Sequence, residues 1–239
     1  MIYYIKPWIY PIILSVEMIC TVMITYFKST NDGHAVKDFP YISDTGNKGV
    51  SASLFSLLFS IYGFLVFINM TIRFEQVKET YNYKDDRFIF LANIGTLSVG
   101  LVACLGVFLA SNFQIDTLKS VHDSGAVMAF GIGTFYFGMQ SIFSFFMTKL
   151  PGSNTITNVI RVIMSVLQTA FLVSTYVMMR QYSNSKDLAD KRIAAILEWI
   201  MALLVTIYWC TFIQEFYQYN WKIQLERIKN KENRVDISH

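Results

Sequence analysis

Six apolar stretches occupy most of this 239-residue chain. Each has roughly 20 residues, the length at which a helix spans the ~30 Å hydrocarbon core of a bilayer. Nearly all Lys, Arg, Asp and Glu residues lie between these stretches. The predicted spans are residues 8–27, 51–72, 88–111, 122–147, 156–179 and 193–216. The sequence therefore predicts an all-α fold, a polytopic bundle of six transmembrane helices.

The composition leaves little chain for a soluble domain. Hydrophobic residues make up 54% of the sequence and charged residues 15%, and the mean hydropathy is +0.40, on the apolar side of ordinary globular proteins. We expect one membrane domain, residues 1–218, followed by a short basic cytosolic tail, residues 219–239. Such a chain has no room for a nucleic-acid-binding module or a large catalytic domain.

The charges around the spans predict the orientation. The first span follows Lys6, as a signal peptide would, but it ends in bulky residues at 24–28, so we expect it to be retained. With a cytosolic N-terminus, 12 of the 20 Lys and Arg residues flank the cytosolic side and 8 the lumenal side. Because positive residues favour the cytosolic side, both termini are predicted to be cytosolic.

The three cysteines, Cys20, Cys104 and Cys210, all lie inside predicted spans. Disulfide bridges between the lumenal loops are therefore excluded. Claudin-like and tetraspanin-like cell-surface proteins are disfavoured, because their extracellular loops depend on such bridges.

Small residues repeat at helical spacing in two of the spans. Within a bilayer, close approach of helices depends on such residues. One stripe consists of Ala92, Thr96, Gly100 and Cys104, and the other of Gly125, Ala129 and Gly133. We predict that the two stripes meet and form the tightest helix pair. The alternative is that they only reflect the general abundance of glycine in transmembrane helices.

Polar groups at mid-membrane depth are few. Glu17 lies near the middle of the first span with no Lys or Arg at the same depth, so we expect it to be protonated or hydrogen-bonded rather than ion-paired. Gln168 in the fifth span is the predicted partner by depth. A polar contact that fixes packing is favoured over a proton or ion relay, which would need several such groups in succession.

Motifs of known catalytic sites are absent from the sequence. It has no HExxH pair, no Walker A loop, no GxSxG elbow and no dinucleotide-binding glycine pattern,. The three histidines are His34, His122 and His239, so a three-histidine metal site would need the C-terminal residue itself. We expect no enzyme activity, no metal and no cofactor; an unrecognised lipid-modifying activity is the alternative.

Four polar residues are predicted on the lumenal side and form a candidate site: Asp44, His122, Asp123 and Glu198. They could converge on a pocket for a lipid headgroup, a cation or a proton. Each also has a structural explanation. Asp44 lies in a turn-forming stretch, Asp123 or Ser124 suits a helix N-cap, and Glu198 could be an interfacial anchor near a helix start.

Two further charged residues are predicted near the cytosolic ends of the last two spans. Arg161 lies in the first turn of the fifth span, and we expect its side chain to extend to the lipid headgroups. Glu215 lies at the end of the sixth span that is opposite Glu198.

Three motifs together resemble the damage-regulated autophagy modulator (DRAM) family. They are Phe-Pro-Tyr-Ile-Ser-Asp-Thr-Gly at 39–46, Val-His-Asp-Ser-Gly-Ala at 121–126, and Glu198-Trp199 followed by Tyr208, Thr211-Phe212 and Gln214-Glu215-Phe216. The resemblance runs in the same order from the first loop to the end of the sixth span. One departure is that Asn-Lys-Gly-Val-Ser at 47–51 stands where the family usually has a pair of prolines, so the start of the second helix is expected to differ.

The resemblance implies a six-helix protein of lysosomal or endosomal membranes that promotes autophagy and, in some members, cell death. The wider superfamily includes a branch that remodels glycosylphosphatidylinositol anchors and a branch that positions phosphatidylinositol 4-kinase at the plasma membrane. Residence in the plasma membrane or the Golgi would fit these branches. The implied partners are membrane lipids and unidentified membrane or cytosolic proteins, and no nucleic acid.

The tail offers a second, weaker hypothesis. Trp221, Leu225 and Ile228 fall at helical spacing among basic residues, so the segment could lie on an anionic leaflet as a helix. An ordinary solvated tail is the favoured interpretation.

Overall fold

Six helical segments that are long and apolar enough to cross a membrane form the described part of the chain. The computed structural model describes residues 2–81 and 84–224. The spans are α1 (Ile9–Asn31), α2 (Gly49–Thr80), α3 (Arg87–Asn112), the composite of α4 (Ile115–Ala126), η2 (Val127–Ile132) and α5 (Gly133–Phe146), α6 (Thr155–Ser185), and α7 (Leu188–Cys210) with α8 (Ile213–Phe216). The predicted all-α membrane bundle is confirmed.

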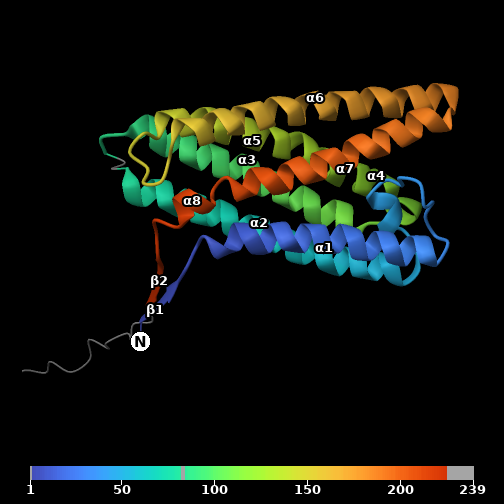
Figure 1. The fold of residues 1–239 in the computed structure, drawn as a ribbon, viewed down its shortest axis with the longest axis horizontal. Helices are drawn as coiled ribbons and strands as arrows, with labels where there is room; N and C mark the ends of the chain where they lie inside the picture. Colours follow the sequence, from blue (N-terminus) through green and yellow to red (C-terminus); the bar gives the residue numbers. More distant parts are fainter. Residues whose placement is uncertain (1, 82–83, 225–239) are drawn as a thin grey trace, which may run out of the picture.

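Consecutive spans pack side by side, and the last closes the ring by packing against α1. Because the number of spans is even, both ends of the described chain lie at the same end of the bundle (Figure 1). There a two-stranded antiparallel ribbon pairs β1 (Ile2–Ile5) with β2 (Trp221–Gln224). We call this the terminal end. The opposite end, the loop end, carries η1 (Ser43–Gly46) and the connection from α6 to α7.

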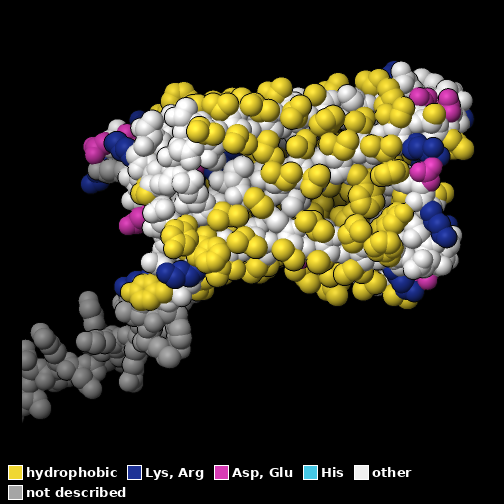
Figure 2. Space-filling model, viewed as in Figure 1, with side chains coloured by type: hydrophobic (Ala, Val, Ile, Leu, Met, Phe, Trp, Pro, Cys, Tyr) yellow, Lys and Arg dark blue, Asp and Glu magenta, His cyan; other side chains and the backbone are white. Residues whose placement is uncertain are grey.

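The surface agrees with a membrane environment. Large apolar side chains such as Val16, Phe64 and Val166 are more than half exposed. Figure 2 shows apolar side chains over the middle of the molecule and charged side chains gathered at its two ends. This exposed band would be unfavourable in water, and lipid covers it at no such cost.

Several helices are longer than their apolar stretches, because backbone hydrogen bonding continues until a cap or a breaker ends it. Asn154 caps α6 by accepting a hydrogen bond from the Thr157 amide at 2.8 Å, and Asp187 caps α7 in the same way,. The fourth span begins at Ile115 rather than at 122, so Asp123 and Ser124 lie inside α4. Their predicted role as an N-cap is wrong.

The two small-residue stripes have different neighbours from those predicted. A Cβ at Gly125 would lie 2.5 Å from the Ala110 amide nitrogen and 2.9 Å from the Gly106 carbonyl oxygen, so α3 and the fourth span do approach closely. Gly106 is outside the predicted stripe. Gly100 instead faces Met70 of α2 and Tyr136 of α5. The stripe in α3 therefore packs toward α2 and α5, while another face of α3 meets Gly125.

The weaker hypothesis for the tail, a helix on the leaflet, is wrong for the part that the structure describes. Trp221 lies in β2, not in a helix, and the ribbon continues at Lys6, whose Nζ donates to the Asn220 side chain at 2.9 Å. Leu225 and Ile228 lie outside the described residues.

Candidate functional site

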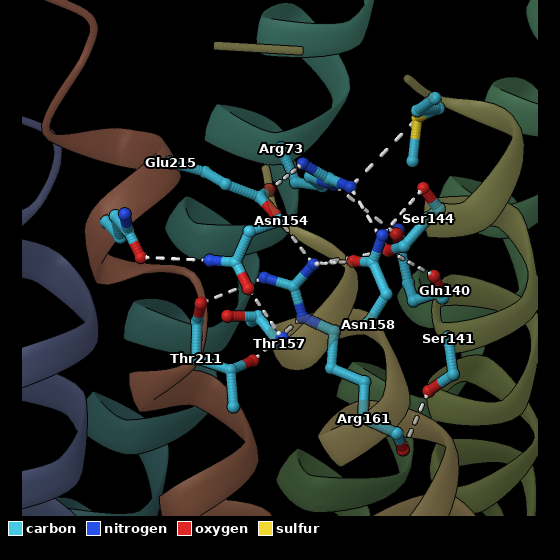
Figure 3. Close-up of polar contacts among 12 residues, drawn as sticks. Arg73, Gln140, Ser141, Ser144, Asn154, Thr157, Asn158, Arg161, Thr211 and Glu215 are labelled. Carbon is cyan, nitrogen blue, oxygen red and sulfur yellow. Dashed lines mark hydrogen bonds and ion pairs between the residues drawn. The ribbon is translucent and has the colours of Figure 1, made fainter. Parts of the chain in front are cut away.

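A buried network of charged and polar side chains fills the terminal end of the bundle. Glu215 of α8 lies between Arg73 of α2 and Arg161 of α6 (Figure 3). Arg73 Nη1 lies 2.5 Å from Glu215 Oε2, and Arg161 Nη1 lies 2.7 Å from Glu215 Oε1. All three side chains are at most 1% exposed. One carboxylate thus joins two guanidinium groups from helices that are distant in sequence.

Neutral side chains complete the coordination of both arginines. Arg161 Nε donates to Thr211 Oγ1 at 2.9 Å, and its Nη2 donates to the Thr211 carbonyl oxygen at 2.9 Å. Arg73 donates to Gln76 and Gln140, and both arginines reach the Ser144 hydroxyl. Arg161 Nη1 also donates to Asn158 Oδ1, and Arg73 Nη2 lies 4.0 Å from Met147 Sδ. The Phe212 ring lies 4.0 Å from the Arg161 guanidinium carbon and 5.1 Å from that of Arg73.

This network corrects the prediction for Arg161. Its side chain is fully buried, so it does not extend to the headgroups. Burial of a charge is unfavourable unless it is paired and hydrogen-bonded, and here Glu215 and the hydroxyl and amide groups supply those partners. The network connects α2, α5, α6, α7 and α8, and therefore determines how these helices meet at the terminal end.

At the loop end, the first loop is attached to the sixth span at Glu198 and Trp199. Because α7 begins at Leu188, Glu198 lies almost three turns inside the helix, and its predicted position near a helix start is wrong,. The Ile42 amide donates to Glu198 Oε2 at 3.0 Å, and Trp199 Nε1 donates to the Pro40 carbonyl oxygen at 2.8 Å. Asp44 pairs with Lys191 at 3.3 Å. Burial, together with the charges of Glu198 and Asp44, raises the pKa of Tyr41 to about 12. Asp44 and Glu198 are thus neighbours, as the predicted lumenal cluster requires.

The other two members of that cluster have separate contacts. Asp123 pairs with Lys119 of its own helix at 2.6 Å. His122 Nδ1 lies 2.9 Å from the Phe113 carbonyl oxygen, and the side chain is buried. Among the described residues, no hydrogen bond or ion pair joins either side chain to Asp44 or Glu198. The four residues therefore form two groups rather than one coordinated site.

The predicted pairing of Glu17 with Gln168 is wrong. Glu17 Oε1 accepts from Thr21 Oγ1 at 2.6 Å within α1. Glu17 Oε2 and Gln168 Oε1 are both buried without a hydrogen-bond partner in the described structure. Gln168 instead lines a small pocket of about 50 Å³ between the helices, together with Tyr62, Cys104 and Trp209. A pocket of this size could hold a few water molecules, each needing roughly 10–15 Å³.

Within the described residues, no cluster of three or more His, Cys, Asp or Glu side chains has the arrangement of a metal site. The charged groups of the terminal network are hydrogen-bonded to one another and to neutral side chains, whereas Gln76 Nε2 is buried without a partner in the described structure. Their arrangement is suited to fixing helices and to creating a local electrostatic field.

Comparison with known proteins identifies the family. The profile described as "Frag1/DRAM/Sfk1/Cwh43P N-terminal domain" matches residues 2–219. The chain belongs to the Frag1/DRAM/Sfk1 family. It is 31% identical over 216 residues to "DNA damage-regulated autophagy modulator protein 1" of Mus musculus, a match that covers 85% of this chain and 88% of that protein. The human protein of the same name is 30% identical over 216 residues, a match that again covers 85% of this chain and 88% of that protein.

A further relative within the Frag1/DRAM/Sfk1 family is "Modulator of macroautophagy TMEM150B-B" of Xenopus laevis. It is 28% identical over 209 residues, covering 87% of this chain and 84% of that protein. No solved structure shows significant similarity to the chain. The predicted DRAM resemblance is confirmed, and the chain is a DRAM-like multi-pass membrane protein.

The motifs that carried the DRAM resemblance occupy the two ends of the bundle. The first-loop motif packs on Glu198 and Trp199. A Cβ at Gly46, which ends that motif, would lie 2.1 Å from the Phe55 ring, so only glycine fits there. The C-terminal motif supplies Thr211, Phe212 and Glu215 to the buried network.

Sequence reasoning missed the convergence of Arg73, Arg161 and Glu215. The predicted second span ends at 72 and leaves Arg73 in the adjoining loop, whereas α2 continues to Thr80. A usable signal was present. All three charges lie near the same predicted end of their spans, and a carboxylate at the depth of two arginines indicates an ion pair.

Proposed function

We propose that this chain modulates autophagy from lysosomal or endosomal membranes, as a protein without enzyme activity and with both termini in the cytosol. The observation that carries the proposal is its similarity, over 85% of its length, to proteins named as autophagy modulators. The even number of spans supports a common side for both termini, and the bias of Lys and Arg favours the cytosol.

The structure supports a regulatory role through its two differently built ends. The loop end holds a short loop against the sixth span by hydrogen bonds to Glu198 and Trp199. The terminal end combines a buried ionic network with a paired ribbon next to the membrane. In the proposed role, membrane lipids and cytosolic or membrane proteins that are not yet identified act at the terminal end.

Localisation and autophagic flux test the proposal together. A C-terminal tag leaves the loop end unchanged. The tagged chain is imaged against lysosomal, Golgi and plasma-membrane markers in cells that lack the endogenous gene, and flux is measured as turnover of a lipidated autophagosome marker with and without a lysosomal inhibitor. Cell death is scored in the same cells. Lysosomal or endosomal residence with altered flux is expected, and plasma-membrane or Golgi residence with normal flux would refute the proposal.

Selective permeabilisation of the plasma membrane tests the topology in the same cells. An antibody against the C-terminal tag should bind without permeabilisation of the organelle membrane, because the tag is cytosolic in the proposed topology. A tag inserted in the first loop should then require organelle permeabilisation. The reverse pattern would contradict the proposed orientation.

A further inference from the structure

A groove on the outside of the terminal end lies directly beside the buried network. Its volume is about 500 Å³, within the range of ordinary ligand sites, roughly 300–1,000 Å³. The lining side chains come from α6, α7 and α8 and from the residues that follow α7 and α8: Thr157, Ile160, Ile207, Cys210, Thr211, Ile213, Gln214 and Tyr217. Ile160, Gln214 and Tyr217 are exposed, so the groove opens toward the surrounding lipid.

The charges behind the groove favour an anion. The network contains two guanidinium groups and one carboxylate, and the described ion pairs of both arginines are with Glu215. Guanidinium groups stay protonated in proteins, so one positive charge is left without a counterion. Thr211 separates it from the groove, since its hydroxyl and carbonyl oxygens accept from Arg161 while the residue lines the groove wall.

Hydrogen-bond donors face the same groove. Gln214 Oε1 accepts from Asn154 Nδ2 at 3.2 Å, which leaves its own Nε2 as a donor. The hydroxyls of Thr157 and Tyr217 and the Gln214 Nε2 donate to no residue that the structure describes. Figure 3 shows Thr211 beside the Arg161 guanidinium group, to which it is hydrogen-bonded. The positive end of the α6 dipole lies in the same turn as Thr157,.

The apolar part of the groove continues toward the middle of the membrane. Ile160 and Ile207 are 43% and 46% exposed and line it one to two helical turns from the polar donors. A ligand that fits must therefore carry a hydrocarbon chain on one side and an anionic group with several acceptor oxygens on the other.

We propose that this groove binds one anionic glycerophospholipid from the leaflet at the terminal end, with its phosphate at Thr157, Gln214 and Tyr217 and an acyl chain along Ile160 and Ile207. The unpaired positive charge of the network selects the anionic headgroup over a zwitterionic one. Lipid binding in this groove would supply one of the lipid contacts of the proposed role, but it does not require that the chain modulates autophagy.

Lipid retention tests the site. The full chain is incubated with vesicles of equal phosphatidylcholine and phosphatidylserine, and in a second arm with phosphatidylinositol in place of phosphatidylserine, and then transferred to mild detergent. Native mass spectrometry counts the lipids that remain bound. We expect one anionic lipid per chain, preferred by about fivefold, the factor that one basic charge near an anionic lipid supplies.

Two tryptophan substitutions distinguish the groove from general lipid contact. Ile160→Trp fills the groove and should abolish retention of the anionic lipid. Ile163→Trp, on the same helix with a parent side chain 52% exposed and outside the lining, should leave retention unchanged. Equal retention by the two variants, or retention of both lipids in the vesicle ratio by the unsubstituted chain, would overturn the proposal.

The headgroup contacts are tested separately. The double substitution Thr157→Val with Gln214→Leu removes two donors and keeps the shape of the groove. We expect retention of both lipids to fall by a similar factor, because both carry the phosphate that these donors bind. The preference for the anionic lipid should stay near fivefold, because the positive charge of the network is unchanged. Unchanged retention would show that the phosphate does not lie at these residues, which contradicts the proposed pose.

Discussion

Substitution of Glu215 by Gln tests the central role of the buried network. Glu215→Gln preserves the shape of the side chain but removes the counterion of both Arg73 and Arg161, which lie 2.5 and 2.7 Å from its oxygens. Two guanidinium groups, each at most 1% exposed, would then face each other without a carboxylate. We expect a large loss of stability and separation of α8 from α2 and α6.

The magnitude follows from the burial of the pair. Removal of one partner of a buried ion pair costs about 3–5 kcal/mol, a large share of a total folding free energy that is typically about 5–15 kcal/mol. For a chain of this size, each kcal/mol shifts the melting temperature by roughly 2–4 °C. The expected decrease for Glu215→Gln is therefore about 6–20 °C.

The matched control is Glu75→Gln. Glu75 pairs with Lys78 at 3.2 Å, but both side chains are about half exposed, and such surface pairs contribute about 0–1 kcal/mol. Thermal unfolding of the purified chain in detergent is followed at one fixed scan rate, because membrane proteins often unfold irreversibly. A difference between the two variants of less than about 2 °C would refute the assignment of Glu215 as the essential counterion.

Three further substitutions test the packing and the loop end. Gly125→Ala should lower the melting temperature, because its Cβ would lie 2.5 Å from a backbone nitrogen of α3. Gly95→Ala, whose Cβ would have nothing within 4 Å, should leave the melting temperature unchanged or raise it. Equal effects of the two substitutions would contradict the close approach of α3 and the fourth span. Gln168→Met should raise the melting temperature by about 2–4 °C, since it removes an unpaired buried acceptor that destabilises the fold by roughly 1 kcal/mol. A decrease would show that Gln168 has a hydrogen-bond partner such as water. Glu198→Ala should speed tryptic cleavage of the first loop because the loop loses its hydrogen bond to α7, whereas Asp123→Asn should leave the rate unchanged. Equal rates for the two variants would show that the Glu198 hydrogen bond does not specifically hold the loop.

The bundle and its motifs followed from the sequence because they are local properties of the chain. A stretch of apolar residues long enough to span a bilayer must form a helix there, since the backbone groups have no other hydrogen-bond partners. The number of spans, their order and the family resemblance therefore needed no knowledge of which helix touches which. The resemblance was confirmed by similarity across the chain.

The partners of the individual polar residues were decided only by the tertiary structure. Arg73, Arg161 and Glu215 are far apart in sequence, and hydropathy assigns each of them only a depth, not a direction around its helix axis. The same limit explains why His122 and Asp123 were grouped with Glu198, and why Gly106 was overlooked beside Gly125.

Depth along the membrane normal can be inferred from sequence because lipid and water differ so strongly as solvents for charge. Rotation of each helix and the choice of its neighbours depend on small differences in packing and on the need to pair every buried charge. These packing and pairing interactions form only when the helices are assembled. The sequence alone therefore determined that this chain is a six-span membrane protein, and the folded bundle decided that Glu215 lies between two arginines.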